Sequence, residues 1–298
     1  MSRMPLQYAA LRDQVCIAVT GSDAAAFLHG QLSQAVLELD PADAPLAGWA
    51  DPRGRMRALL RVCRLPDRWL LITPRSGADD LVKKLRMFVL RSKVALTTAG
   101  DLEVAALLGD DGTALAGYGV AADAPPNRVT RGSDLSFIRV GASYWQVLGA
   151  PAALARLAAT LDPTDETAAV LAEIRLGLPA ITPETAERYV AQMLNLDALG
   201  AVSFDKGCYP GQEVIARVHN LGGVKRRARR YAAPGAPPAL STAVLADART
   251  VGEVVRSTAA ESGCELLAVV EHGAAEAALT CGGAPLRGLP LPFDVPRD

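Results

Sequence analysis

The chain has 298 residues, of which 50% are hydrophobic and 21% are charged, so it can bury a core large enough for two or three domains. Its formal net charge of -1 gives no bulk attraction to nucleic acid or to an anionic membrane surface. The N-terminus lacks the continuous apolar core of a signal peptide, and no stretch approaches the roughly 18 apolar residues of a membrane span. We therefore expect a cytoplasmic protein with no membrane partner.

The cysteines suggest no covalent framework. They are odd in number, lie far apart and form no C-x-x-C pair, which favours neither a set of disulfides nor a structural zinc site. We expect no metal site, and we expect most of these thiols to act as small buried hydrophobes. The cysteines are Cys16, Cys63, Cys208, Cys264 and Cys281.

The first expected element is a strand over residues 14–20, in which β-branched side chains alternate with smaller ones. A helix should follow, capped by Ser22 or Asp23 and carrying apolar residues at helical spacing until Pro41. The chain is therefore predicted to begin with a strand and then a helix.

Residues 56–62 and 69–73 are the next two expected strands, and a turn-forming sequence between them predicts an antiparallel hairpin. Ser76 with Asp79 resembles a capping pair. The apolar stripe that follows, with basic residues toward its end, predicts a helix that extends to about Arg91.

Three further strands are expected before the middle of the chain. Residues 104–108 form one, and residues 137–140 and 144–148 are expected to pair across a glycine-containing turn. A helix should start near Pro151. Because strands and helices do not alternate regularly, the order predicts an α+β fold and not a doubly wound sheet.

The stretch from Tyr231 to Pro238 contains three prolines and a glycine, which marks it as the best boundary signal in the sequence. Beyond it lie short apolar runs at 250–255, 266–270 and 277–280, separated by glycines. These runs predict a small β domain at the end of the chain.

Most residues suited to chemistry gather in one short run between Phe204 and Arg217, and the usual sequence motifs of nucleotide-binding, zinc-protease and serine-hydrolase sites are absent. Two glycines and a proline in this run would let the backbone turn tightly and bring amide N–H groups close to a ligand. The positive charges of Lys206 and Arg217 could favour the thiolate of Cys208, which would make it a nucleophile, a redox sensor or a ligand for a soft metal.

For each of these residues, a purely structural role is an alternative to a functional one. A single cysteine is most often an inert, buried side chain, and isolated lysines, arginines and glutamates are most often solvated. His29 lies on the apolar first helix and is more typical of a packed or surface residue than of a ligand. For His219, just past the run, a place in a pocket and a place outside it are equally well supported.

The run from Phe204 to Glu213 resembles the K-G-C-Y-x-G-Q-E signature of the YgfZ family, and it matches at every specified position. Other stretches are also similar to that family, so the resemblance covers the chain up to about Arg227. These stretches are 27–33, 88–94, 174–179 and 192–197.

The resemblance implies a relation to the T-protein of the glycine cleavage system. It implies an α+β fold with a bilobed folate-binding core of mixed antiparallel sheets and helices at 1–225, which includes a ferredoxin-like lobe at 46–100, and a C-terminal β-barrel at 226–298. It also implies that tetrahydrofolate or a derivative is the cofactor. Members support the maturation or repair of iron–sulfur enzymes, including enzymes that modify tRNA, and we expect no turnover by the chain itself.

The resemblance assigns two kinds of role within the signature. A pterin presents an amidine-like edge that a carboxylate or carboxamide can grip, and a folate tail carries carboxylates that attract lysine or arginine. The implied catalytic residues are Cys208 and Lys206, and the implied cofactor-binding residues are Gln212, Glu213, Tyr209 and Arg217.

Two departures from the T-protein pattern bear on activity. T-proteins carry an Asn-Asp pair in the first helix, where this chain has Ser33, Gln34 and Ala35, and their glutamate in an L-E-A-G stretch falls on Arg175. These carboxylates are the groups best suited to fix a pterin and to stabilise positive charge on a reacting folate nitrogen. Folate-dependent aminomethyl transfer is therefore the alternative function and not the first choice.

The basic run from Lys225 to Arg230 has two interpretations. It could contact tRNA phosphates or the acidic face of a partner protein. Since aromatic residues are not interleaved with these charges, a solvated linker or strand face is favoured.

Overall fold

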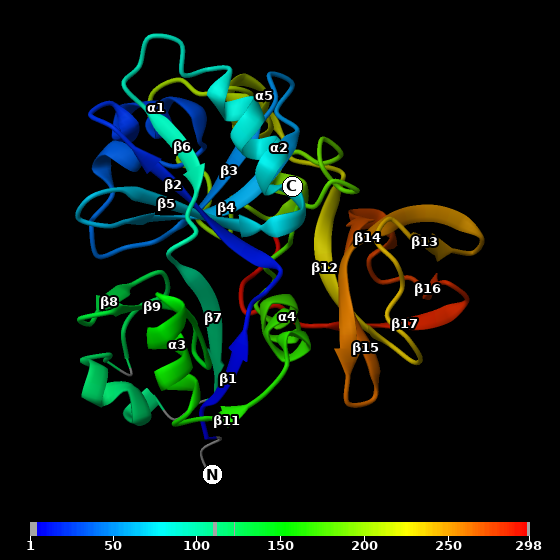
Figure 1. The fold of residues 1–298 in the computed structure, drawn as a ribbon. Coiled ribbons are helices and arrows are strands. Elements are labelled where there is room, and N and C mark those ends of the chain that lie inside the picture. Colours follow the sequence, from blue (N-terminus) through cyan, green and yellow to red (C-terminus); the bar gives the residue numbers. More distant parts are fainter. Residues whose placement is uncertain (1–4, 110–111, 122, 297–298) are drawn as a thin grey trace. The chain divides into compact units, whose positions relative to one another are not determined.

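The computed structural model describes residues 5–109, 112–121 and 123–296, and Figure 1 shows their helices and strands. They form two compact units. Unit 1 comprises the chain up to Leu28, Val36–Pro45 and Leu60–Ala172, and unit 2 comprises His29–Ala35, Leu46–Leu59 and the chain from Glu173 onward. Each unit is therefore assembled from separate stretches of sequence.

A six-stranded sheet in unit 1 has the strand order β11-β1-β7-β10-β9-β8. Strands β9 and β10 pair antiparallel, as the sequence predicts, and Val147 lies opposite Phe137. Helix α3 (Pro151–Ala158) begins on the predicted proline and packs Leu154 and Leu157 into the same hydrophobic core. The strands are β1 (Gln7–Ala10), β7 (Glu103–Leu108), β8 (Val129–Arg131), β9 (Leu135–Gly141), β10 (Tyr144–Gly149) and β11 (Asp162–Pro163), and a 3-10 helix (Gly112–Tyr118) follows β7.

A second sheet has the order β3-β4-β5-β2-β6, and its β4 and β5 form the predicted antiparallel hairpin. Helix α2 (Arg75–Arg86) packs against β2, β5 and β6. The capping pair predicted at Ser76 and Asp79 is wrong, because the helix starts one residue after Pro74 and has no side-chain cap. The helix also ends before Arg91. The strands are β2 (Gln14–Thr20), β3 (Leu46–Ala50), β4 (Met56–Arg64), β5 (Trp69–Pro74) and β6 (Ala95–Thr98).

The first helix is shorter than the sequence predicts. Helix α1 covers Ala24–Gln31, and only a 3-10 turn (Val36–Glu38) precedes Pro41. The chain leaves the helix at Ser33, whose buried hydroxyl donates to the carbonyl of Ala201 at 2.6 Å and accepts the N–H of Gly48 at 2.7 Å. These long-range bonds end the helix, although apolar spacing continues in the sequence.

Unit 2 contains a closed barrel with the strand order β12-β15-β14-β13-β16-β17. The stretch from Tyr231 to Pro238, which the sequence marks as a boundary, lies inside this barrel, because β12 continues to Ala233 and a loop then leads to β13. That expectation is wrong, since prolines also suit a loop between two strands of one barrel. The strands are β12 (Arg226–Ala233), β13 (Ala243–Ala246), β14 (Arg249–Ala260), β15 (Gly263–Glu271), β16 (Leu279–Cys281) and β17 (Ala284–Leu289).

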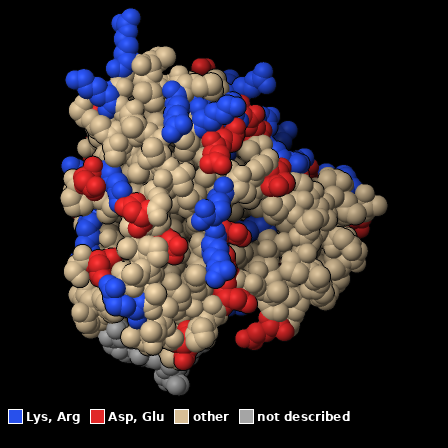
Figure 2. Space-filling view, in the orientation of Figure 1, with Lys and Arg blue, Asp and Glu red and all other residues tan. Residues whose placement is uncertain are grey.

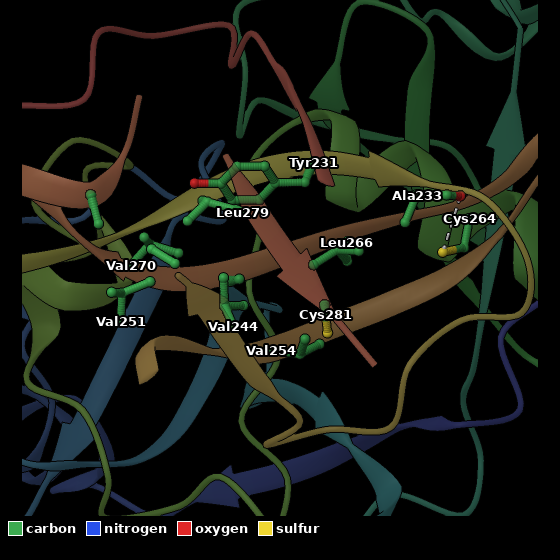
Figure 3. Close-up of a cluster of buried hydrophobic side chains, with 13 residues drawn as sticks. Tyr231, Ala233, Val244, Val251, Val254, Cys264, Leu266, Val270, Leu279 and Cys281 are labelled. Atoms are coloured by element: carbon green, nitrogen blue, oxygen red, sulfur yellow. Dashed lines mark hydrogen bonds between the residues drawn. The ribbon is translucent and has the colours of Figure 1, made fainter. Parts of the chain in front are cut away.

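Small and branched apolar side chains fill the barrel, as Figure 3 shows. Tyr231, Val244, Val254 and Leu266 are at most 3% exposed, and the thiol of Cys264 donates to the carbonyl of Ala233 at 3.6 Å. The mixed sheets and this closed barrel confirm the predicted α+β class with a C-terminal β-barrel. The domain limits at 1–225, 46–100 and 226–298 stay predictions.

Charged residues of both signs lie next to one another over much of the face in Figure 2, in keeping with the net charge of -1. Within the part of the chain that the structure describes, no helix is long and apolar enough to cross a membrane. The remaining helical segments are α4 (Glu166–Arg175), a 3-10 turn (Ala191–Leu194), α5 (Gln212–Leu221) and a 3-10 turn (His272–Ala274).

Candidate functional site

The signature run forms a turn that leads into helix α5, and Gly211 is required at the junction. Its φ of +81° is left-handed, and a Cβ there would lie 2.4 Å from the carbonyl oxygen of Asp51 and 2.7 Å from the Cα of Gly54. The opposing turn is itself fixed, because the Asp51 carboxylate accepts the N–H groups of Arg53 and Arg55 at 2.9 and 2.8 Å. Two rigid turns therefore meet backbone to backbone at the start of α5.

Lys206 holds the turn against the end of α1. Its Nζ donates to the backbone carbonyls of His29, Leu32 at 2.6 Å and Gln34 at 3.2 Å. An ammonium group has three protons to donate, and carbonyls at a helix C-terminus attract a positive charge. The geometry therefore gives Lys206 a positioning contact, and its ammonium is directed at backbone oxygens.

Tyr209 and Gln212 form the inner side of the turn. The Tyr209 ring is 8% exposed and lies 4.8 Å from the Nζ of Lys206, and burial raises the pKa of its hydroxyl to about 12. The Oε1 of Gln212 accepts the backbone N–H of Tyr209 at 3.2 Å. The amide NH₂ of Gln212 has no partner among the described residues, so it can still donate to a ligand.

Cys208 is the exposed cysteine of the chain, at the outer side of the same turn. The other four thiols are buried, as the sequence predicts for most cysteines, and burial raises the pKa of Cys16 to about 12. The sequence suggests Lys206 as a source of positive charge for this thiol, whereas the structure directs the Lys206 ammonium to three backbone carbonyls. No group of three or more possible metal ligands occurs among the described residues.

The first two turns of α5 carry the remaining predicted residues. Glu213 and Arg217 are both exposed and are four positions apart, so they share one face of the helix. Two residues further along, the ring of His219 stacks on Phe204, with centroids 3.7 Å apart and planes inclined by 14°. No local pattern in the sequence links His219 to Phe204, because the two residues lie on opposite sides of a turn, so the sequence alone leaves the place of His219 open.

Buried polar contacts connect α5 to the barrel. The side-chain amide of Gln192 donates to the carbonyl of Ile215 in α5 at 2.7 Å, and Asn195 donates to the carbonyl of Ala228 in β12 at 2.8 Å. Arg227 is 3% exposed and forms a bidentate pair with Asp197 at 2.9 and 3.0 Å. Gln192, Asn195 and Asp197 all belong to the 192–197 stretch, so this stretch links helix α5 to strand β12.

The basic run from Lys225 to Arg230 forms most of strand β12 and is largely engaged. Besides the pair at Arg227, Arg226 binds Glu271 at 3.2 Å and Arg230 binds Glu265 at 2.7 Å. The run does form a strand, but the expectation of a solvated face is wrong for Arg227, which is buried. The carboxylate partners of these arginines cancel the charge that phosphates of a nucleic acid would need.

Arg175, at the position of the T-protein glutamate, also binds Glu265, through its Nε at 3.1 Å and a terminal nitrogen at 2.9 Å. Burial alone would raise the pKa of Glu265, but the hydrogen bonds from Arg175 and Arg230 outweigh it and lower the pKa. The position that the sequence marks as a lost carboxylate is thus part of an ion-pair cluster. Likewise, Gln34 donates to the carbonyls of Leu46 at 3.1 Å and Gly200 at 2.8 Å.

No protein-family profile matches the chain. The chain is 30% identical to the tRNA-modifying protein YgfZ of Cronobacter sakazakii over 235 residues, which cover 76% of this chain and 70% of that protein. It is also 30% identical to the protein of the same name from Klebsiella pneumoniae over 234 residues, 76% of this chain and 71% of that one.

A solved structure shares the fold. Aminomethyltransferase T of the glycine cleavage system from Bartonella henselae matches with a TM-score of 0.77 at 16% identity, over 96% of this chain and 85% of that one. The T-protein-like fold that the sequence predicts is therefore confirmed. Sequence identity over most of the chain, together with the complete signature at the turn before α5, shows that the chain belongs to the YgfZ family.

Proposed function

We propose that this protein binds a reduced folate at the signature turn and, in the cytoplasm, supports the maturation or repair of iron–sulfur enzymes, including enzymes that modify tRNA. Family membership and the T-protein-like fold support this proposal. In this interpretation the chain acts as a folate-binding partner of client enzymes and performs no turnover of its own.

The observation that carries the proposal is the rigid turn with its unsatisfied polar edge. Lys206 and Gly211 fix the backbone, while the Gln212 amide and the Glu213 carboxylate remain available at the start of α5. An amide that donates and a carboxylate that accepts match the mixed edge of a pterin ring. Arg217, on the same helix face as Glu213, suits the carboxylates of a folate tail.

We assign to Cys208 the reaction with a client iron–sulfur enzyme. It is exposed on a turn whose backbone is held by Lys206, so its sulfur is presented to a partner in one place. A presented thiol can exchange with a disulfide or bind a soft metal on a client. Lys206, which the family resemblance implies as catalytic together with Cys208, contributes to the reaction of the thiol by positioning the turn.

Aminomethyl transfer remains the second candidate because the fold matches an aminomethyltransferase. The local chemistry argues against it. Gln34 and Arg175 stand at or beside the positions of the two T-protein carboxylates, and both are committed to other contacts, Gln34 with backbone carbonyls and Arg175 with Glu265. Neither side chain supplies the carboxylate that would stabilise positive charge on a reacting folate nitrogen.

We also propose that tRNA is reached through the client enzymes and not through strand β12. Arg226, Arg227 and Arg230 are paired with carboxylates, which leaves no continuous basic track on this strand.

The test is complementation of a bacterial strain that lacks its YgfZ homologue. The wild-type chain should restore the activity of iron–sulfur enzymes that modify tRNA, and Cys208→Ala should not. Full restoration by Cys208→Ala would remove the proposed role of the thiol. In parallel, formation of methylene-tetrahydrofolate from an aminomethylated lipoyl carrier protein would favour the transferase instead.

A further inference from the structure

The inner face of the barrel changes from apolar to basic toward one end. Tyr231 and Ala233 on β12 belong to the hydrophobic interior, and so does Val270 on β15. Because side chains alternate along a strand, Arg229 shares the inner face of β12 with Tyr231, and His272 begins the 3-10 turn that follows β15. A terminal nitrogen of Arg229 lies 3.3 Å from the Nδ1 of His272. Arg229 and His272 therefore lie together at this end of the barrel.

A cavity of about 620 Å³ opens at this end of the barrel. Lys225, Arg229 and His272 line it, and Glu276 is the carboxylate among its lining residues, with its side chain exposed. Two fixed positive charges and an imidazole therefore face one carboxylate. The cavity has the size of a small-molecule site.

Arg229 differs from the other arginines of its strand. Arg226, Arg227 and Arg230 each pair with a carboxylate, whereas no described carboxylate lies within ion-pair distance of Arg229. Its Nε is buried and has no hydrogen-bond partner among the described residues. A buried guanidinium N–H without an acceptor is costly, so a ligand that supplies an acceptor would be favoured at this end of the barrel.

The hydroxyl of Tyr231 is a second buried donor without a partner. The residue is 3% exposed, and in Figure 3 its hydroxyl points away from the end of the barrel where Ala233 and Cys264 lie. Tyr231 lies two residues from Arg229 on β12 and shares its inner face. A ligand in the cavity that accepts hydrogen bonds and carries negative charge would satisfy Arg229, which lines it.

We propose that this end of the barrel binds a small phosphate-bearing anion, either inorganic phosphate or a phosphomonoester, through Arg229 with support from Lys225 and His272. A phosphate group offers several acceptor oxygens to the planar fork of an arginine, and its negative charge matches the excess of cations. A small anion suits the cavity better than a nucleic acid does, because the outward-facing Arg226 and Arg230 are already paired. This site is independent of the proposed folate site.

The test uses the full chain without folate and follows the imidazole Cε1–H resonances by NMR. The chain has three histidines, so His272→Gln assigns the signal of interest. Titration with inorganic phosphate in one arm and ribose 5-phosphate in another separates a free anion from a sugar-linked one. Saturable shifts of the His272 signal are expected in at least one arm.

Matched variants give the specificity. Arg229→Gln should weaken binding at least about tenfold, as expected for a lost charged hydrogen bond. Glu276→Gln should strengthen binding, because it removes the negative charge at the cavity, and the exposed Arg287→Gln on β17 should leave binding unchanged. Lys225→Gln, at an exposed cation that lines the cavity, should weaken binding several-fold even if Arg229→Gln folds poorly.

The proposal is overturned if the His272 signal shows no saturable shift up to about 10 mM of either anion. It is also overturned if folded Arg229→Gln and Lys225→Gln both bind as the wild type does. Tighter binding of an RNA oligonucleotide than of ribose 5-phosphate would overturn the proposal of a small anion and indicate a nucleic acid as the ligand. A failure to bind tetrahydrofolate would leave this result untouched.

Discussion

Replacing Lys206 with methionine tests whether its ammonium fixes the signature turn. The substitution keeps most of the side-chain volume and removes the positive charge. The carbonyls of His29, Leu32 and Gln34 then lose their common donor, and the Tyr209 ring loses the cation 4.8 Å from its centre. The turn before α5 should open more often.

The magnitude follows from the contacts. Three charge-assisted hydrogen bonds would sum to more than 4 kcal/mol at about 1.5–3 kcal/mol each, and the cation–π contact adds about 0.5–1 kcal/mol. Water can replace the donor because these bonds are only partly buried, so we expect a net loss of about 2–3 kcal/mol. That loss corresponds to roughly a 30- to 150-fold increase in the opening equilibrium.

Hydrogen exchange followed by mass spectrometry is the suitable assay, because a chain of two compact units has no single free energy of unfolding. Peptides that cover Phe204–Leu221 should exchange faster by that factor in Lys206→Met, while peptides from β9 and β10 in unit 1 should not change. Lys83→Met, on the exposed side of α2, serves as the matched control. Protection within threefold of wild type in Lys206→Met would refute the positioning role.

Three further predictions concern other residues. A thiol reagent should modify Cys208 alone in the native protein and all five cysteines after unfolding, and fast native reaction of Cys208→Ser would contradict this. Burial raises the pKa of Tyr231 to about 12 from an ordinary value of 10, so the native protein holds the phenol proton more tightly than the unfolded protein does. The stability of the fold should therefore decrease as the pH rises from about 10 to 12, and the decrease should be smaller in Tyr231→Phe. The pKa of Glu265 is lowered below its ordinary value of 4.5, so the ionised carboxylate stabilises the fold above that pH, and this stabilisation is lost as the pH falls further. Thermal unfolding of Glu265→Gln should therefore depend less on pH in that acid range. An unchanged pH profile would argue against the Arg175 and Arg230 pairs.

Local sequence signals were sufficient for most strands. Alternating β-branched residues located β2, and the glycine-containing turn predicted the pairing of β9 with β10. The end of α1 was predicted too late because Ser33 is held by Ala201, a residue 168 positions further along the chain. Contacts at such separations leave no local pattern.

The signature run identified the right region but not the role of each side chain. The carbonyls that Lys206 contacts lie 177, 174 and 172 residues earlier, and backbone carbonyls carry no sequence signal at all. The Phe204–His219 stack depends on how the turn folds back on α5. The basic run of β12 seemed available in the sequence because its partners, Asp197, Glu265 and Glu271, come from other elements.

The central claim, that the signature turn binds a reduced folate, is tested most directly by calorimetric titration with tetrahydrofolate under anaerobic conditions. We predict saturable binding by the wild type and at least about tenfold weaker binding by Glu213→Gln, which removes one charged acceptor. Glu261→Gln, at the exposed turn between β14 and β15, should bind as the wild type does. Absence of heat from binding in the wild type, or equal affinity of Glu213→Gln, would contradict the claim.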